Sequence, residues 1–164
     1  MSNTAYDKLI AEDEEYIVYE MNMIHKGLYA DGVIAINKDL AVREKTCILA
    51  EELGHHFTSY GDILDQSKHE NEKQELRARA WAFEKLLPID RFVTAFEHGC
   101  LNRFEIADFL EVTEEFIAES VEYYKRKYGT FALTTSGHVV YFDPLGVMKR
   151  IDNQSQQGAI NVRI

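Results

Sequence analysis

The chain has 164 residues, 46% of them hydrophobic and 28% charged, with 28 acids against 18 bases and a formal net charge of −10. This length and composition predict one folded domain with a sizeable core and exclude a disordered chain. The acidic balance weighs against direct nucleic-acid binding, which is normally carried by a basic surface, and favours a protein partner or a small ligand.

The first segments predict a helix followed by a small sheet. Residues 4–15 form an acidic stretch that suits a short helix and lacks the apolar core of a secretory signal. Residues 16–23, YIVYEMNM, are rich in β-branched and aromatic side chains and predict a strand. Residues 27–37 hold the turn pair Asp31 and Gly32 between apolar flanks, which predicts a hairpin.

Helical patterns dominate the middle of the chain. A helix is predicted from Ala41 to Tyr60 with its end at Gly61, followed by a polar loop over residues 61–71. Further helices are predicted over residues 73–87, 89–98, 102–110 and 114–128, the last one capped by Thr113.

The C-terminal part returns to strand patterns. Residues 131–144 predict a hairpin around Ser136 and Gly137. Because helices and strands are segregated rather than alternating, the predicted class is α+β. We expect a single domain over residues 1–150 and a polar tail over residues 151–164.

No apolar run reaches the roughly 20 residues that cross a bilayer, so we expect no membrane segment. Cys47 and Cys100 lie in apolar surroundings, which suits buried thiols better than a disulfide. Together with the missing secretory signal, these features predict a cytoplasmic protein.

The stretch TCILAEELGHHF, residues 46–57, combines an apolar helix with three ionisable side chains. On a helix Glu51 and His55 share one face, and Glu52 lies between that face and the apolar stripe. Burying a lone carboxylate costs several kcal/mol unless it is paired or bound to a metal. A polar site in this helix is therefore more plausible than a solvated acidic face.

The next helix offers a further ligand. Glu75 projects from the same side as the apolar Ala78 and can meet Glu51 and His55, which is the geometry of a metal site with ligands at i, i+4 and on a neighbouring helix. The alternative is structural: E-E-x-x-H strings occur by chance, and Glu75 can pair with Arg79 four residues later.

The two segments ILAEELGHHFTSYGDILDQ and KQELRARAWAFEKLLP, at this spacing, resemble the ImmA/IrrE family of zinc metallopeptidases in its prophage and mobile-element variant. The similarity runs from about Tyr16 to Tyr128. It implies a small antiparallel sheet packed on a helical zincin-like core, followed by a helical region and a hairpin. It also implies a zinc site in which an H-E-x-x-H helix supplies two ligands and the general base.

Carried over residue by residue, the resemblance makes His55 the second zinc-binding histidine and Glu52 the catalytic acid. Glu75 is the first candidate for the third ligand. Arg77 stands at the alternative acidic position of the family pattern, and Asp62 in the following loop is a second candidate. Tyr60, His56 or His69 could stabilise an oxyanion, and His56 equally suits a structural role; His25, His98 and His138 show no partner pattern.

The departure from the family is Glu51, which replaces the first histidine. A carboxylate can bind zinc, so the site need not be lost. Two glutamates and a neutral histidine would cancel the charge of a divalent ion and acidify its bound water less. Oxygen-rich ligation also relaxes discrimination against Mn²⁺. Metal binding is therefore more plausible than efficient hydrolysis.

The resemblance implies a partner: a phage or mobile-element repressor with a helix-turn-helix domain, which the protein cleaves. The alternative is an antirepressor that binds the repressor through the same fold without cutting it. Direct DNA binding through a helix-turn-helix at residues 106–121 is a third idea, but its recognition helix would turn four carboxylates toward phosphates, those of Glu114, Glu115, Glu119 and Glu122.

Overall fold

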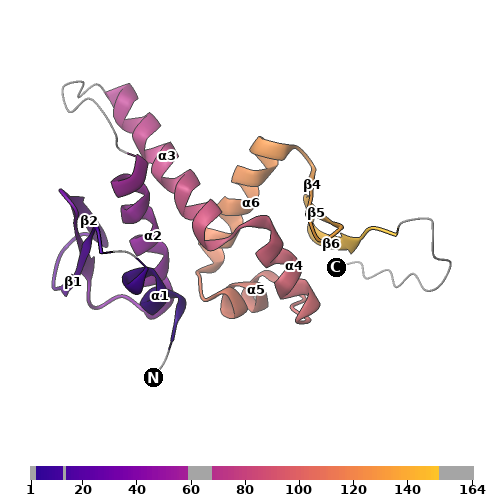
Figure 1. Cartoon of the computed structure of the whole chain (residues 1–164), viewed down its shortest axis with the longest axis horizontal. Coiled ribbons are helices and arrows are strands. Elements are labelled where there is room, and N and C mark those ends of the chain that lie inside the picture. The colour runs from indigo at the N-terminus through magenta and orange to yellow at the C-terminus, as the bar shows by residue number, and fades with distance from the viewer. Residues whose placement is uncertain (1–2, 13, 59–67, 152–164) are drawn as a thin grey trace. The chain divides into compact units, whose positions relative to one another are not determined.

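In the computed structural model, residues 3–12, 14–58 and 68–151 are described, with the side chains of residues 68–70 left aside. They form six helices and six strands, which confirms the α+β class (Figure 1). The elements are α1 (Ala5–Ala11), β1 (Ile17–Met21), β2 (Gly27–Ala30), β3 (Val33–Asn37), α2 (Val42–Thr58), α3 (Lys68–Leu86), α4 (Ile89–Glu97), α5 (Arg103–Leu110), α6 (Glu114–Tyr128), β4 (Phe131–Leu133), β5 (His138–Phe142) and β6 (Leu145–Lys149).

The chain divides into two compact units, and the first comprises residues 1–86 and 111–113. Its sheet has the strand order β1-β3-β2, with β1 parallel to β3 and β2 antiparallel to it. The predicted hairpin is present. Asp31 and Gly32 between β2 and β3 have φ angles of 47° and 81°, as a two-residue turn with both central residues left-handed requires. The sheet is thus mixed rather than purely antiparallel.

One face of this sheet packs against α2 through Ile34 and Ile36 of β3, which are fully buried. Period-2 alternation turns their neighbours to the other face, where Ile17, Tyr19 and Met21 of β1 are half exposed. Within the described residues of this unit, one face of the sheet therefore supports α2 and the opposite face is partly exposed to solvent.

α2 and α3 run side by side as the principal helix pair of the first unit (Figure 1). Gly54 makes the close approach possible, because a Cβ atom at this position would overlap the backbone carbonyl of Ala78. Phe57 and Trp81 stack at a centroid distance of 5.1 Å and close one end of the contact. The predicted loop over residues 61–71 is wrong from Lys68 onward, since α3 begins there, and the rest of it lies outside the described residues.

The second unit comprises residues 87–110 and 114–164. α4, α5 and α6 pack with an antiparallel sheet of order β4-β5-β6. The predicted helices and the hairpin at Ser136 and Gly137 are present, whereas β6 was not predicted. Tyr124 of α6 lies at the centre, and its hydroxyl donates to the Leu87 carbonyl at 2.8 Å.

Cys47 and Cys100 are free and buried, as expected. No helix in the described parts of the chain is long and apolar enough to cross a membrane. The single domain over residues 1–150 stays a prediction, and of the tail only Ile151 falls within the described residues.

Candidate metal centre

The predicted site lies on the α2 face that meets α3. Glu51 and His55, one helical turn apart, are both half-buried, and Glu52 follows on the side that meets β2. The buried positions around them are apolar or small, among them Ala50, Leu53 and Gly54. Packing of the apolar stripe thus keeps these ionisable side chains partly shielded from solvent.

His55 and Glu75 meet across the helix pair. The Nε2 atom of His55 lies 3.2 Å from Oε2 of Glu75, with 27% of the His55 side chain and 54% of the Glu75 side chain exposed. Two atoms that bind one tetrahedral zinc ion at roughly 2.0–2.1 Å lie about 3.4 Å apart. The spacing therefore suits a direct hydrogen bond and also two ligands of one ion.

Glu51 takes a different partner. Its Oε1 atom lies 3.7 Å from Nε of Arg79, which sits one turn beyond Glu75 on α3. The structure thus brings two of the three predicted ligands together and pairs the third with a cation. Within the described residues no three His, Cys, Asp or Glu side chains are gathered closely enough to hold a metal ion.

The pKa of Glu52 is shifted well above its usual value. Burial, followed by the negative charges of Glu51 and Glu75, raises its pKa to about 7. A hydrogen bond from the backbone of Tyr29 acts in the opposite direction. A carboxyl group with this pKa changes protonation near neutral pH, which is where a general base is most effective.

The edge strand β2 provides that hydrogen bond. The N–H of Asn37 donates to the carbonyl of Lys26, so alternation along the ladder directs the backbone groups of Gly27 and Tyr29 away from β3. Gly27 lies directly against Glu52, because a Cβ atom there would stand 2.6 Å from Oε1. The absence of a side chain at Gly27 is what lets the strand cover the carboxyl group.

His56 belongs to an aromatic cluster instead. Its Nδ1 lies 3.0 Å from the Tyr29 hydroxyl, and its ring packs edge-on against Tyr16, Tyr29 and Phe57. These contacts support the structural reading of His56 over a role in oxyanion stabilisation. Tyr60 and Asp62, as well as the side chain of His69, lie outside the described residues.

The donor set fits a divalent cation in its chemistry. Burial is the main cause of the raised pKa of Glu52, and the negative charges of Glu51 and Glu75 add to it. A cation bound by His55, Glu75 and Glu51 would offset that negative charge. Such binding would draw Glu51 away from Arg79.

Sequence reasoning missed the roles of Arg79, Gly27 and Gly54. The sequence offered Glu75 as the partner of Arg79 in the structural alternative, and it did not predict the contact with Glu51 across the helix pair. The glycine in E-E-L-G-H was a usable signal, since a glycine inside a helix often marks a close contact with a neighbouring backbone. Gly27 carries no comparable signal, because its neighbour Glu52 is 25 positions away in the chain.

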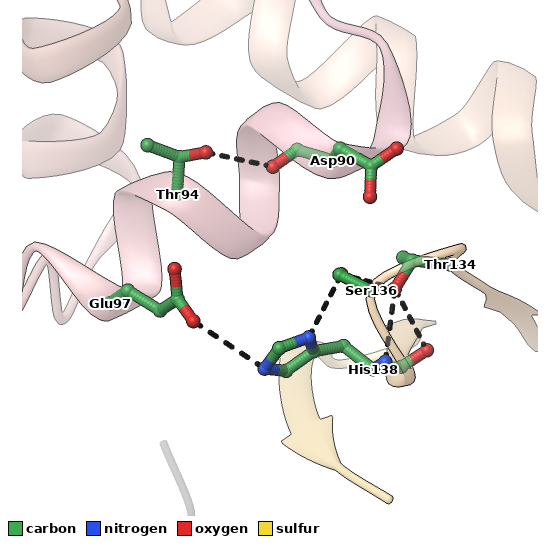
Figure 2. A network of polar contacts seen from close by, with 6 residues as sticks. All are labelled: Asp90, Thr94, Glu97, Thr134, Ser136 and His138. Atoms are coloured by element: carbon green, nitrogen blue, oxygen red, sulfur yellow. Dashed lines mark hydrogen bonds and ion pairs between the residues drawn. The ribbon is translucent and has the colours of Figure 1, made fainter.

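A second histidine–glutamate pair lies in the other unit (Figure 2). His138 on β5 faces Glu97 on α4 with Nε2 and Oε1 3.6 Å apart, and its Nδ1 lies 3.0 Å from the Ser136 hydroxyl. Thr134 completes the turn by accepting the backbone N–H of His138 at 3.0 Å. Both ring nitrogens are thus engaged by the hairpin and the adjacent helix.

The comparison with known families gives the same assignment as the resemblance. Residues 12–122 match the model of the Peptidase M78 family, described as the IrrE N-terminal-like domain. The chain belongs to this family. Peptidase M78 is a metallopeptidase-type family, and the match covers α2 and α3 with all four candidate side chains. A search of curated proteins returned no match to the chain.

Membership of the M78 family bears on the helix-turn-helix idea. The match includes α5 and most of α6, so residues 106–121 lie within the region that the family model covers. The would-be recognition helix α6 also exposes Glu114, Glu115 and Glu122 to solvent. Such a surface repels a phosphate backbone.

Proposed function

We propose that this M78-family chain is a metal-dependent endopeptidase, with Zn²⁺ or Mn²⁺ as its ion, that acts on a phage or mobile-element repressor of the helix-turn-helix type. The observation that carries the proposal is the meeting of His55 and Glu75 at 3.2 Å beside the half-buried Glu52, whose pKa lies near 7. A perturbed acid next to potential ligands is typical of a hydrolytic site.

His55, Glu75 and Glu51 are the residues that would hold the ion. A divalent cation bound there supplies Lewis acidity toward a peptide carbonyl and acidifies water. Glu52 takes the proton from the attacking water and delivers it to the leaving amine. Burial, the largest cause of the raised pKa of Glu52, persists when an ion is bound and favours this role, because it makes the carboxylate a stronger proton acceptor.

The edge strand β2 supports a peptide substrate. Gly27 and Tyr29 direct their backbone groups away from β3, and the Tyr29 backbone also bonds Glu52. An extended chain can add to such an edge through main-chain hydrogen bonds. A peptide bound there would run beside the carboxyl group that acts on it.

The charge of the chain suits the proposed partner. A net charge of −10 favours docking on a basic protein surface, and a repressor that binds DNA carries one. We expect no direct binding to nucleic acid or membrane.

The test incubates the purified protein, loaded with Zn²⁺ or Mn²⁺, with the repressor encoded beside it, and follows the repressor by mass spectrometry. We expect a discrete cut that Glu52→Gln slows by roughly 10²- to 10⁴-fold, the usual contribution of a general base. Glu44→Gln is the matched control, because Glu44 lies on the same helix and pairs with Lys26 away from the site.

The result also separates proteolysis from the alternative. An intact repressor that leaves its operator DNA when the protein is added would assign the chain as a non-proteolytic antirepressor. Equal cleavage by the Glu52→Gln and Glu44→Gln variants would remove Glu52 from the proposal.

A further inference from the structure

Arg79 places a positive charge beside a predicted metal ligand, which is unusual for a site that binds a cation. Its guanidinium lies 3.7 Å from the Glu51 carboxylate, with 35% of the Arg79 side chain and 23% of the Glu51 side chain exposed. A cation therefore stands at the carboxylate that replaces the first histidine of the family pattern.

The position of Arg79 follows from the packing of α2 and α3. Gly54 brings the two helices together at Ala78, next to Arg79 in sequence. Glu51 pairs with Arg79, and His55 pairs with Glu75. The later residue of α2 thus meets the earlier residue of α3, as in antiparallel helices. Residues spaced by four on each helix share a face, which makes both contacts part of one surface.

We propose that Arg79 is a built-in counter-ion that competes with the divalent cation for Glu51 and so sets the metal affinity of the site. The inference rests on the metal centre of the proposed function and deepens it. A carboxylate oxygen that binds a metal loses most of its attraction for a guanidinium, and the two cations repel each other at this distance. Loading the site therefore requires Arg79 to leave Glu51.

Competition of this kind explains how Glu51 can serve a metal site and still pair with Arg79 in the metal-free protein. Besides His55, the site contains the carboxyl groups of three glutamates and one guanidinium, namely those of Glu51, Glu52, Glu75 and Arg79. In the metal-free protein Arg79 offsets part of the acidic excess. In the loaded protein the metal takes over that task and Arg79 is released toward solvent.

The test is the affinity for Zn²⁺ alone, measured by calorimetric titration of the chelator-stripped full chain at fixed pH and salt. We expect Arg79→Gln to bind Zn²⁺ about threefold to tenfold more tightly than the wild type, the gain from removing a partly exposed ion pair and a nearby positive charge. Arg77→Gln removes the same charge from an exposed position of α3 and should leave the affinity unchanged.

A double-mutant cycle with Glu51→Gln isolates the pair. In the Glu51→Gln background, Arg79→Gln should give at most a small gain, because the carboxylate for which the two cations compete is gone. Circular dichroism checks that each variant is folded. If Arg79→Gln does not fold, Arg79→Met, which keeps an unbranched apolar side chain of similar reach, replaces it in the same cycle.

The outcomes separate this inference from the proposed function. Zn²⁺ binding by the wild type with no difference between the Arg79 and Arg77 variants, or with weaker binding by the Arg79 variant, overturns the role of Arg79 and leaves the metal centre standing. Failure of every folded variant to bind Zn²⁺ overturns both.

Discussion

The two histidine–glutamate pairs described above, both contacts between imidazole and carboxylate within the described residues, have similar distances and different surroundings. His55 and Glu75 connect two helices of the first unit, and 27% of the His55 side chain is exposed. His138 and Glu97 connect a strand and a helix of the second unit, and only 10% of the His138 side chain is exposed. A contact between imidazole and carboxylate therefore does not by itself mark a functional site.

The neighbours of each pair make the difference. Near His55 three carboxyl groups, those of Glu51, Glu52 and Glu75, outnumber the single guanidinium of Arg79, and their negative charge adds to burial in raising the pKa of Glu52. Beside His138 the nearby groups are the hydroxyls of Ser136 and Thr134, which satisfy the turn (Figure 2). Unbalanced negative charge attracts a cation, whereas a satisfied hydrogen-bond network holds a hairpin in place.

The largest effect on Zn²⁺ affinity is expected from replacing the histidine of the first pair, His55, and not that of the second pair, His138. Because changes in groups that only orient a ligand already cost roughly 10- to 100-fold in metal affinity, loss of His55 as a ligand should cost at least about 100-fold. We expect this loss of Zn²⁺ affinity for His55→Ala and no loss for His138→Ala, measured by the same titration. Equal effects of the two substitutions would contradict the distinction.

The helix contact is the next point to test. Gly54→Ala places a methyl group against the Ala78 backbone and should lower the free energy of unfolding by about 1–3 kcal/mol, as overpacking does. It should also weaken Zn²⁺ binding, since α3 carries Glu75. Urea unfolding with and without the metal measures both effects. Ala118→Gly on α6, in the other unit, should leave Zn²⁺ affinity unchanged.

Glu52 gives the first unit a specific pH dependence. In the metal-free protein its pKa of about 7 means that the folded state keeps a proton that the unfolded chain releases above about pH 4.5. The unfolded state thus binds fewer protons in this range, and stability falls as the pH rises toward 7. Glu52→Gln should remove this part of the decline in urea midpoints with chelator present, and Glu44→Gln should preserve it.

The smallest effect is expected in the second unit. Ser136→Ala removes a hydroxyl that contacts both His138 and Thr134 in an exposed turn. It should lower the free energy of unfolding by about 0.5–1.5 kcal/mol, the usual net contribution of a hydrogen bond. Zn²⁺ affinity should stay at the wild-type value. A large change in that affinity would show that the second pair belongs to the metal site after all.

Local sequence signals predicted most elements because their causes are local. Asp31 and Gly32 specified a hairpin turn, and both residues have positive φ angles in the structure. The parallel pairing of β1 with β3 is a non-local choice that no turn signal encodes. β6 likewise depends on pairing with β5 rather than on its own pattern.

The sequence indicated which ionisable side chains lie on the two helices, but not which of them contact each other. The motif placed Glu51, Glu52 and His55 on α2, and the face of α3 indicated Glu75. Which acid meets which base depends on the depth and direction of helix packing, which Gly54 and Ala78 determine. The contact between Arg79 and Glu51 across the helix pair therefore could not be predicted from the spacing along either helix.

Tyr29 links the edge strand to the chemistry of the helix. Its backbone hydrogen bond holds down the pKa of Glu52, and its hydroxyl contacts both His56 and the N–H of Gly32. Any displacement of β2 that breaks the backbone bond makes the carboxylate a stronger base. The pKa of Glu52 thus depends on the position of β2. It can therefore differ between the protein with a peptide bound along β2 and the protein without one.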